Sequence, residues 1–262
     1  MVAIGRVDPE KRNQQFEFIQ AERERHQLLG SAILSVDTKK KEFLGGLYRD
    51  GMLYSYQGKP LKRFDHDFPY LADGKVVPHG IYDLQANSGF ITLGTSSETA
   101  EFIGASLKLW WNRRGRFDYP KAETIFLLFD SGGANACRSH QFKLEMLKLA
   151  AQTGRIWQIA HYPPYCSKWN PIEHRFFPHV TRAIQGIYLD SVETVRTCII
   201  DRARTSTGLT SRAYILDRQF QRGQKTIEIL PEGYPLVADA VLSQWNYTCY
   251  PNELYKTLTY LN

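Results

Sequence analysis

The sequence has few cysteines, no long apolar run and no repeated or low-complexity segment. Its 262 residues include four cysteines, none of them in a CxxC pair, which argues against a disulfide framework. No stretch approaches the roughly 20 consecutive apolar residues that a membrane-spanning helix needs. The amino-terminal residues also lack the apolar core of a secretory signal. We therefore expect a cytoplasmic protein with no membrane partner.

The overall composition is that of an ordinary globular protein. Hydrophobic residues make up 43% of the chain and charged residues 23%, which excludes the disordered and fibrous classes. The length allows one large domain or two small ones. The formal net charge of +6 is a mild indication of an anionic partner and identifies none by itself.

Hydrophobic periodicity predicts hairpin strands first and alternating strands and helices afterwards. The expected strands lie at residues 31–37, 41–49, 52–58, 89–93, 124–130 and 156–160. The expected helices lie at residues 9–28, 100–115, 139–152 and 192–204, and another begins at Pro171. Asp8 and Ser96 are the expected caps of the first two helices, and Asp50-Gly51 is the expected hairpin turn. This order predicts a mixed sheet with helices on its faces.

Two of the predicted strands end in an aspartate. Asp37 follows the apolar run SAILSV, and Asp130 follows TIFLLF, 93 residues later. Parallel neighbouring strands would bring the two side chains together at the edge of the sheet where ligands collect. Glu173, just inside the helix that follows the next strand, could reach the same point. Each aspartate taken alone is also typical of a turn, but the three together favour an active site.

The chemistry of three clustered carboxylates indicates a divalent metal. Such groups repel one another unless cations lie among them, and oxygen-only ligands suit Mg²⁺ or Mn²⁺. Two such ions in one site can activate an attacking oxygen and stabilise a leaving oxygen in phosphoryl transfer. The glycines of the turn DSGGAN, which begins at Asp130, would let a ligand approach the backbone closely.

The chain resembles the Rhodopirellula-type DDE transposase family in segments that follow one another from residue 35 to residue 248. These segments are SVDTKKKEF, HDFP, GIYDLQANSGF, FDSGGAN, HYPPYCSKWNPIEHRFF and QWNYT. The family is similar to the wider DDE transposases and retroviral integrases. The resemblance implies an α/β fold of the ribonuclease-H-like kind, a mixed five-stranded sheet flanked by helices with a C-terminal extension. We expect an N-terminal helical segment at residues 1–30, the catalytic core at 31–190 and the extension, packed on the core, at 191–262.

The resemblance also implies a function. Asp37, Asp130 and Glu173 would be the catalytic triad and would bind two divalent ions, Mg²⁺ or Mn²⁺. The implied reaction is cleavage of transposon-end DNA by water, followed by transfer of the 3′-hydroxyl group into target DNA. Its partners would be double-stranded DNA and other copies of the chain assembled on it, which would associate the protein with the nucleoid. A nuclease without strand joining and a catalytically idle, DNA-binding remnant are the alternatives.

One departure from the family concerns the amino-terminal end. Relatives usually carry a DNA-binding segment ahead of the catalytic domain, whereas only 36 residues precede Asp37 here, with no convincing helix-turn-helix pattern. We therefore expect a catalytic fragment or a truncated copy.

Basic and polar residues near the carboxylates are candidates for DNA contact, because cationic groups dominate nucleic-acid affinity. The candidates are Lys39, Lys40, Lys41, Lys168, Asn170, His174, Arg202 and Arg204. Arg202 and Arg204 belong to an arginine-rich stretch at residues 196–225. A solvated turn is an equally good interpretation of the three lysines, and scattered arginines on a solvated helix would look much the same.

Other conspicuous residues have a structural interpretation beside the functional one. Tyr162, Tyr165 and Trp169 could stack on unpaired bases, although Trp169 is better explained as pinning its loop to the core. Trp110-Trp111 is assigned to the core, and the acids of His66-Asp67 and Asp83 to turns. A zinc site is not favoured, because the histidines and cysteines from residue 137 to residue 179 lack the usual paired spacing.

Overall fold

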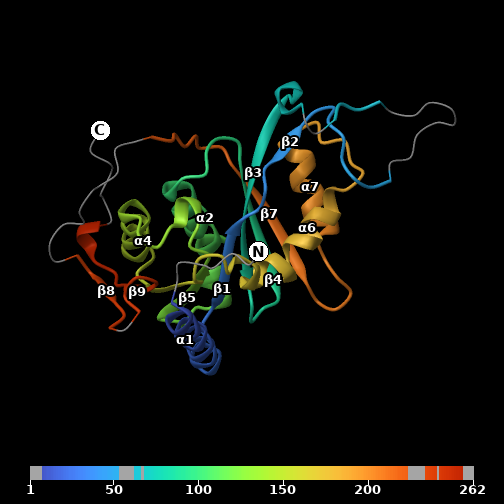
Figure 1. Ribbon diagram of the computed structural model, residues 1–262. Coiled ribbons are helices and arrows are strands. Elements are labelled where there is room, and N and C mark those ends of the chain that lie inside the picture. The colour runs from blue at the N-terminus through green and yellow to red at the C-terminus, as the bar shows by residue number, and fades with distance from the viewer. Residues whose placement is uncertain (1–7, 53–61, 66–67, 224–233, 241, 256–262) are drawn as a thin grey trace.

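The computed structural model describes residues 8–52, 62–65, 68–223, 234–240 and 242–255. A nine-stranded mixed sheet runs through the molecule in the order β7-β4-β3-β1-β5-β6-β9-β8, and β2 pairs with β3 (Figure 1). The strands are β1 (Ile33–Thr38), β2 (Glu42–Leu44), β3 (Gly74–Asp83), β4 (Ser88–Gly94), β5 (Thr124–Phe129), β6 (Ile156–His161), β7 (Thr210–Leu216), β8 (Leu236–Ala238) and β9 (Asn246–Cys249). Strands β3 and β1 are antiparallel, whereas β1, β5 and β6 are parallel.

Helices cover both faces of this sheet. They are α1 (Pro9–Leu28), α2 (Ala100–Trp110) with its π-helical continuation Trp111–Gly115, α3 (Arg116–Asp118), α4 (His140–Thr153), α5 (Pro171–Arg175), α6 (Phe177–Ile184) and α7 (Val192–Arg202). Helices α2 and α4 pack on one face, and α6 and α7 pack on the other (Figure 1). Helix α1 lies on the same face as α6 and α7, over β1, β5 and β6. No helix in the described part of the chain is both long and apolar enough to span a membrane.

The helix boundaries follow from local chemistry. Asp8 caps α1 by accepting a hydrogen bond from the Glu10 amide at 3.0 Å, as its position before Pro9 predicts. Gly154 ends α4 with a φ of 64°, in the left-handed region that glycine enters without strain. Helix α2 differs from the expectation. Its cap is Thr99, which accepts from the Phe102 amide, rather than Ser96.

The predicted five-stranded core is present, and the sheet is larger than predicted. Strands β4-β3-β1-β5-β6 form the ribonuclease-H-like centre, an antiparallel trio joined to a parallel pair. The chain after residue 208, in which the sequence indicates no clear element, adds β7 to one edge and β9 and β8 to the other. This addition is a tertiary effect, because edge strands are defined by the neighbour with which they pair.

Two sequence expectations about the early strands need correction. The first predicted strand of the hairpin contains β2, but β2 pairs with β3, with Glu42 opposite Val76. Most of the second predicted strand, residues 52–58, lies outside the described residues. His66-Asp67 lies outside them too. Strand β3 was not predicted at all, because Pro78 and Gly80 interrupt its apolar pattern. It is nevertheless central and buried between β1 and β4.

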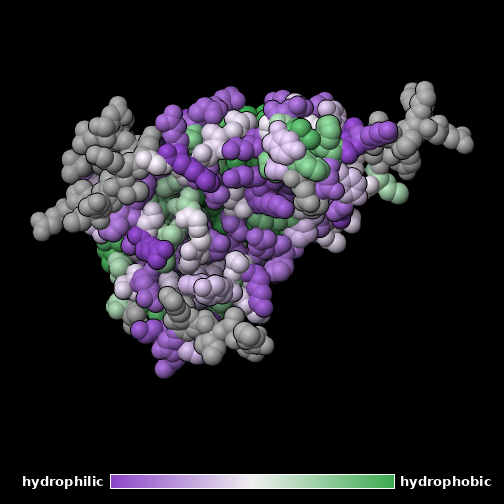
Figure 2. Space-filling model, turned by 45° about the horizontal axis from the view of Figure 1, so that its top comes forward, coloured by the Kyte–Doolittle hydropathy of each residue, from purple (hydrophilic) through white to green (hydrophobic). Residues whose placement is uncertain are grey.

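The core consists mainly of side chains from the central strands. Strands β1 and β5 are almost wholly buried, as expected for parallel strands covered on both faces. Trp110 and Trp111 are 3% and 5% exposed and meet the ring of Trp157, which confirms their assignment to the core. Hydrophilic side chains cover much of the face drawn in Figure 2, with smaller hydrophobic patches between them.

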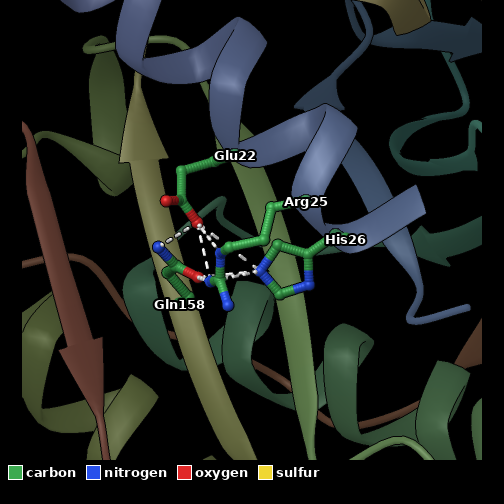
Figure 3. A network of polar contacts seen from close by, with 4 residues as sticks. All are labelled: Glu22, Arg25, His26 and Gln158. Atoms are coloured by element: carbon green, nitrogen blue, oxygen red, sulfur yellow. Dashed lines mark hydrogen bonds and ion pairs between the residues drawn. The ribbon is translucent and has the colours of Figure 1, made fainter. Parts of the chain in front are cut away.

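A polar network holds helix α1 to the middle of β6 (Figure 3). Gln158 donates to Glu22 at 2.8 Å, and its side-chain oxygen accepts from Arg25 at 2.7 Å. The same oxygen lies 2.8 Å from the ring of His26, which is buried. Burial lowers the pKa of His26. The helix therefore docks through hydrogen bonds as much as through its few buried apolar side chains.

Candidate active site

The register of the central strands brings the two aspartates together. Strands β1 and β5 are parallel, and Val36 lies opposite Phe129. Every pair of opposite residues is 93 positions apart in the sequence, and so are Asp37 and Asp130. Asp37 and Asp130 are consequently the next neighbours in this register, at the carboxyl ends of adjacent parallel strands. This is the edge at which α/β sheets collect ligands.

Glu173 reaches the same place because the start of α5 is fastened to β1. The Ser35 hydroxyl donates to the side-chain oxygen of Asn170 and accepts from the Ile172 amide at 2.8 Å. The side-chain amide of Asn170 donates to the Val36 carbonyl oxygen at 3.1 Å. These bonds join the residues just before Asp37 to those just before Glu173, so the two carboxylates are positioned together.

Gly80 makes room for this arrangement. It lies directly opposite Asp37 in the β1–β3 pairing. A Cβ atom there would lie 2.5 Å from a ring carbon of Phe177 and 2.8 Å from the terminal methyl group of Ile172. A side chain at this position would therefore push α5 and α6 away from the sheet.

The electrostatics of Asp37 show how closely the carboxylates are grouped. Burial raises the pKa of Asp37 to about 9, with further contributions from the charge of Asp130 and from a hydrogen bond with the side chain of Glu173. Asp130 is held by Asn135, whose side-chain amide donates to it at 3.0 Å. Near neutral pH this group of carboxylates needs a proton or a cation to offset its mutual repulsion.

The donor set fits Mg²⁺ or Mn²⁺. Among the described residues, no three His, Cys, Asp or Glu side chains are grouped closely enough to form a ready-made metal cage. Magnesium rarely uses such a cage, since it is usually held by one or two carboxylates together with water and substrate phosphates. Asp37, Asp130 and Glu173 are each only partly buried, which is compatible with an open site of this kind.

The histidine and cysteine side chains near the site have other roles. His161 is buried, and burial lowers its pKa to about 4, so the ring is neutral at physiological pH. Its Nδ1 atom lies 3.1 Å from the Asp130 carbonyl oxygen. A neutral ring donates from Nδ1 to such an acceptor, which helps to orient the turn at Asp130. Cys166 is a buried free thiol within the core cluster beneath α1.

The residues predicted to contact DNA differ in their accessibility. Lys40 is exposed, whereas the ammonium group of Lys39 is paired with Glu42 at 2.5 Å; Lys41 is partly exposed. Lys168 and His174 are exposed on either side of Glu173, and the His174 ring contacts the Lys168 carbonyl oxygen.

Asn170 does not occupy a DNA-contacting position. Its side chain is fully buried and makes the two hydrogen bonds to β1 that fasten α5. Asn170 therefore positions α5 on β1 and does not make the predicted phosphate contact. The adjacent Trp169 is 59% exposed and meets Phe16 of α1 edge-on at 6.1 Å. Tyr165 is exposed as well, whereas Tyr162 is buried.

Arg202 and Arg204 are not brought to the carboxylates. Both are exposed, at the end of α7 and just before β7 begins at Thr210. The strand register places Thr210 beside Ser88, Ser88 beside Asp83, and Asp83 beside Leu34. Leu34 lies near the start of β1, whereas Asp37 lies near its end. The two arginines therefore lie at the opposite end of the strands from Asp37.

Ser35 and Gly80 are the contributors that sequence reasoning missed. Ser35 stands two residues before Asp37 and so shares its face of the strand, a period-2 signal that could have marked it. Gly80 carries no such signal, because its role depends on the ring of a residue almost a hundred positions away.

Comparison with known proteins identifies the family of this chain. Residues 5–251 match the family described as the Rhodopirellula transposase DDE domain. The chain belongs to this family. The match covers nearly the whole sequence and confirms the resemblance seen in its motifs. None of the curated proteins compared with the chain matches it significantly.

Solved structures of Mos1 transposase are similar at low sequence identity. The Mos1 paired-end complex with the left transposon end has a TM-score of 0.48 at 18% identity, covering 75% of this chain and 57% of that one. The Mos1 strand transfer complex has a TM-score of 0.45 at 20% identity, covering 75% and 56%. This chain therefore matches less than two thirds of the length of those transposase chains.

Proposed function

We propose that this chain is the catalytic domain of a DDE transposase that cuts a DNA strand and joins its 3′-hydroxyl group to a target. The observation that carries this proposal is the grouping of Asp37 with Asp130 and Glu173, which add to the effect of burial in raising the pKa of Asp37 to about 9. Family membership supports the same conclusion. The expected partner is double-stranded DNA, and assembly of several copies on that DNA stays a prediction.

Asp37, Asp130 and Glu173 would together hold the divalent ions Mg²⁺ or Mn²⁺. When bound, such ions supply a Lewis acid that lowers the pKa of a bound water and offsets charge on phosphate oxygens. The chain's own residues supply the positions. Ser35 and Asn170 keep Glu173 beside Asp37, and Asn135 holds Asp130.

DNA would approach over the exposed residues that border this site. Lys40 and Lys168 provide positive charge for the phosphate backbone. The exposed rings of Tyr165 and Trp169 offer surfaces on which an unpaired base could stack. This pairing of charge and aromatic surface is what a splayed or nicked DNA end requires.

The test is strand cleavage by the purified chain and by Asp130→Asn. Supercoiled plasmid and labelled short duplexes are incubated with Mn²⁺ or Mg²⁺, and nicked and joined products are separated on gels. We expect nicking and joining by the wild-type chain and a loss of at least about 100-fold in Asp130→Asn, since one carboxylate ligand is removed. Asp201→Asn, an exposed aspartate on α7, serves as the matched control.

A second measurement does not depend on activity. Mn²⁺ should raise the melting temperature of the wild-type chain by binding only the folded state, and it should raise that of Asp130→Asn much less. Nicking without joining would identify a nuclease. Full activity in Asp130→Asn, or an equal response to Mn²⁺ in both proteins, would refute the site.

A further inference from the structure

A cleft of about 570 Å³ lies beside the edge strand β7, away from the carboxylates. Its lining includes Arg114 from the π-helical continuation of α2, Arg196 from α7 and Arg212 from β7 itself. Two consecutive elements, α7 and β7, and a third from much earlier in the chain therefore each contribute an arginine to the lining of one cleft. Scattered arginines on a solvated helix would not converge in this way.

Two acidic side chains pair with two of the three arginines of this cleft, which leaves it with a net positive charge. Asp118 pairs with Arg114 at 2.8 Å, and Glu193 pairs with Arg196 at 3.1 Å. The Glu193 side chain is 66% exposed, so this second ion pair is weak and readily exchanged for another anion. Arg212 is exposed in the middle of its strand and adds a further positive charge.

Aromatic rings form the wall of the cleft and hold its shape. Tyr214 stacks on Phe90 of the neighbouring strand, with 4.9 Å between the ring centroids. The guanidinium group of Arg113 lies 5.6 Å from the centroid of the Tyr214 ring, and Trp110 completes this side. The Arg196 Nε atom donates to the Ala213 carbonyl oxygen at 3.2 Å, which fixes that arginine against the strand edge.

The cleft lies at the β7 edge of the sheet, between residues of the α2 face and residues of α7, whereas the candidate active site lies at the centre of the sheet. Arg212 pairs with Phe90, which packs in the core cluster beneath α2 and α4. Asp37 is opposite Gly80, whose Cβ position is occupied by residues of α5 and α6 on the other face. Three strand spacings, about 14 Å in all, also separate β7 from β1. A phosphate at the carboxylates therefore cannot contact the cleft.

We propose that the β7 cleft binds the phosphate backbone of DNA at a point separate from the phosphate that is cut. Guanidinium groups bind phosphate oxygens in pairs through parallel N–H donors, and three of them in one cleft can hold consecutive phosphates. The choice of DNA as the source of these phosphates rests on the proposed function. The cleft itself would accept the same chemistry from a small phosphate ligand.

The experiment measures DNA binding without divalent metal, so that catalysis plays no part. Fluorescence anisotropy of a labelled duplex is recorded from low to moderate salt for the wild-type chain and for the double variant Arg114→Gln/Arg212→Gln. Arg116→Gln/Lys121→Gln is the matched control, because it removes the same charge from nearby exposed positions outside the cleft. Melting temperatures establish that every variant is folded.

We expect the cleft variant to bind the duplex about tenfold more weakly at low salt than the control. Its log–log salt dependence should be shallower by about two, because roughly one unit of slope is lost with each phosphate contact. Arg212→Glu should weaken binding more than Arg212→Gln. Equal binding by the cleft variant and the control, or no binding of DNA by the wild-type chain, would overturn the proposal.

Inorganic phosphate separates the two sources of the ligand. If it raises the melting temperature of the wild-type chain but not that of the cleft variant, and DNA binding is equal in both, the cleft is a small-phosphate site and its assignment to DNA is wrong. Failure of the proposed function has a different signature. It appears as a wild-type chain that binds DNA and never nicks it.

Discussion

A single hydroxyl group joins the two halves of the candidate active site. Ser35 lies two residues before Asp37, and its hydroxyl accepts from the Ile172 amide and donates to the buried Asn170, one and three residues before Glu173. It touches none of the reacting atoms and is a positioning residue. Its value lies in precision, because a displacement of about 1 Å in a catalytic group can cost about 100-fold in rate.

Ser35→Ala should lower strand cleavage by about 10- to 100-fold and raise the Mn²⁺ concentration needed for half-maximal activity. It should also cost about 1–3 kcal/mol of stability, since the Ile172 amide and the Asn170 oxygen lose their partner. The measurements are urea unfolding and cleavage as a function of Mn²⁺.

Ser211→Ala is the control for this variant. The Ser211 hydroxyl donates to the Ile199 carbonyl oxygen at 2.8 Å, far from the carboxylates. It should lose comparable stability while its Mn²⁺ requirement stays that of the wild type. A similar shift in the Mn²⁺ requirement of both variants would show that Ser35 has only a structural role.

At the scale of elements, two glycines allow α5 and α6 to lie directly on the sheet. Gly80 in β3 leaves space for Phe177 and Ile172, and Gly89 in β4 leaves space for Phe176, whose ring lies 2.1 Å from where a Cβ atom would be. The helix that carries Glu173 can approach Asp37 only because these strand positions lack side chains. Close packing of this kind transmits a small change in one element to the next.

Gly80→Ala should destabilise the protein by about 1–3 kcal/mol through overpacking, and it should reduce cleavage because α5 shifts. Gly74→Ala, in the same strand, is the matched control, because its Cβ atom would meet Leu44 at an ordinary 3.5 Å. Urea unfolding midpoints and cleavage rates compare the two. Equal effects would mean that the close contacts at Gly80 relax without cost.

For the whole molecule, buried titratable groups set opposing dependences of stability on pH. Burial raises the pKa values of Asp83 and Glu145 in the folded chain. The free energy of unfolding therefore falls as the pH rises above the pKa values that these groups have in the unfolded chain. His79 acts in the other direction, because burial lowers its pKa to about 3. The hydroxyl of Ser106 donates to Thr92, so the Nδ1 atom of His79 donates to Ser106 at 2.8 Å, and the lowered pKa keeps the ring neutral at physiological pH.

The stability due to neutral His79 should be lost as the pH falls from about 6.5 towards 3. In this range the unfolded chain binds a proton that the folded chain excludes. Between pH 7 and pH 4.5, the wild-type free energy of unfolding should fall by about 2–3 kcal/mol more than that of His79→Gln, which cannot titrate. Urea unfolding at the two pH values checks this.

His174→Gln is the control for this prediction. The ring of His174 is exposed, so replacing it should leave the difference between the two pH values as in the wild type. Parallel losses in the wild type and in His79→Gln would show that the buried ring takes up its proton without unfolding.

Local signals in the sequence predicted much of the fold. Asp8 and Pro9 marked the start of α1, Gly154 marked the end of α4, and continuous apolar runs marked β1, β5 and β6. Such signals are readable because caps, turns and buried strands depend on neighbouring residues. Strand β3 escaped prediction because Pro78 and Gly80 oppose its local pattern, and β7 escaped because pairing with β4 defines it.

The sequence alone determined that two buried strands end in Asp37 and Asp130 and that a helix with Glu173 follows. Only the tertiary structure decided which residues hold these groups together and where the remaining charge gathers. Ser35, Gly80 and the arginines of the β7 cleft act through partners from distant parts of the chain. Contacts of that kind are created by strand register and helix packing, and no local pattern of residues records them.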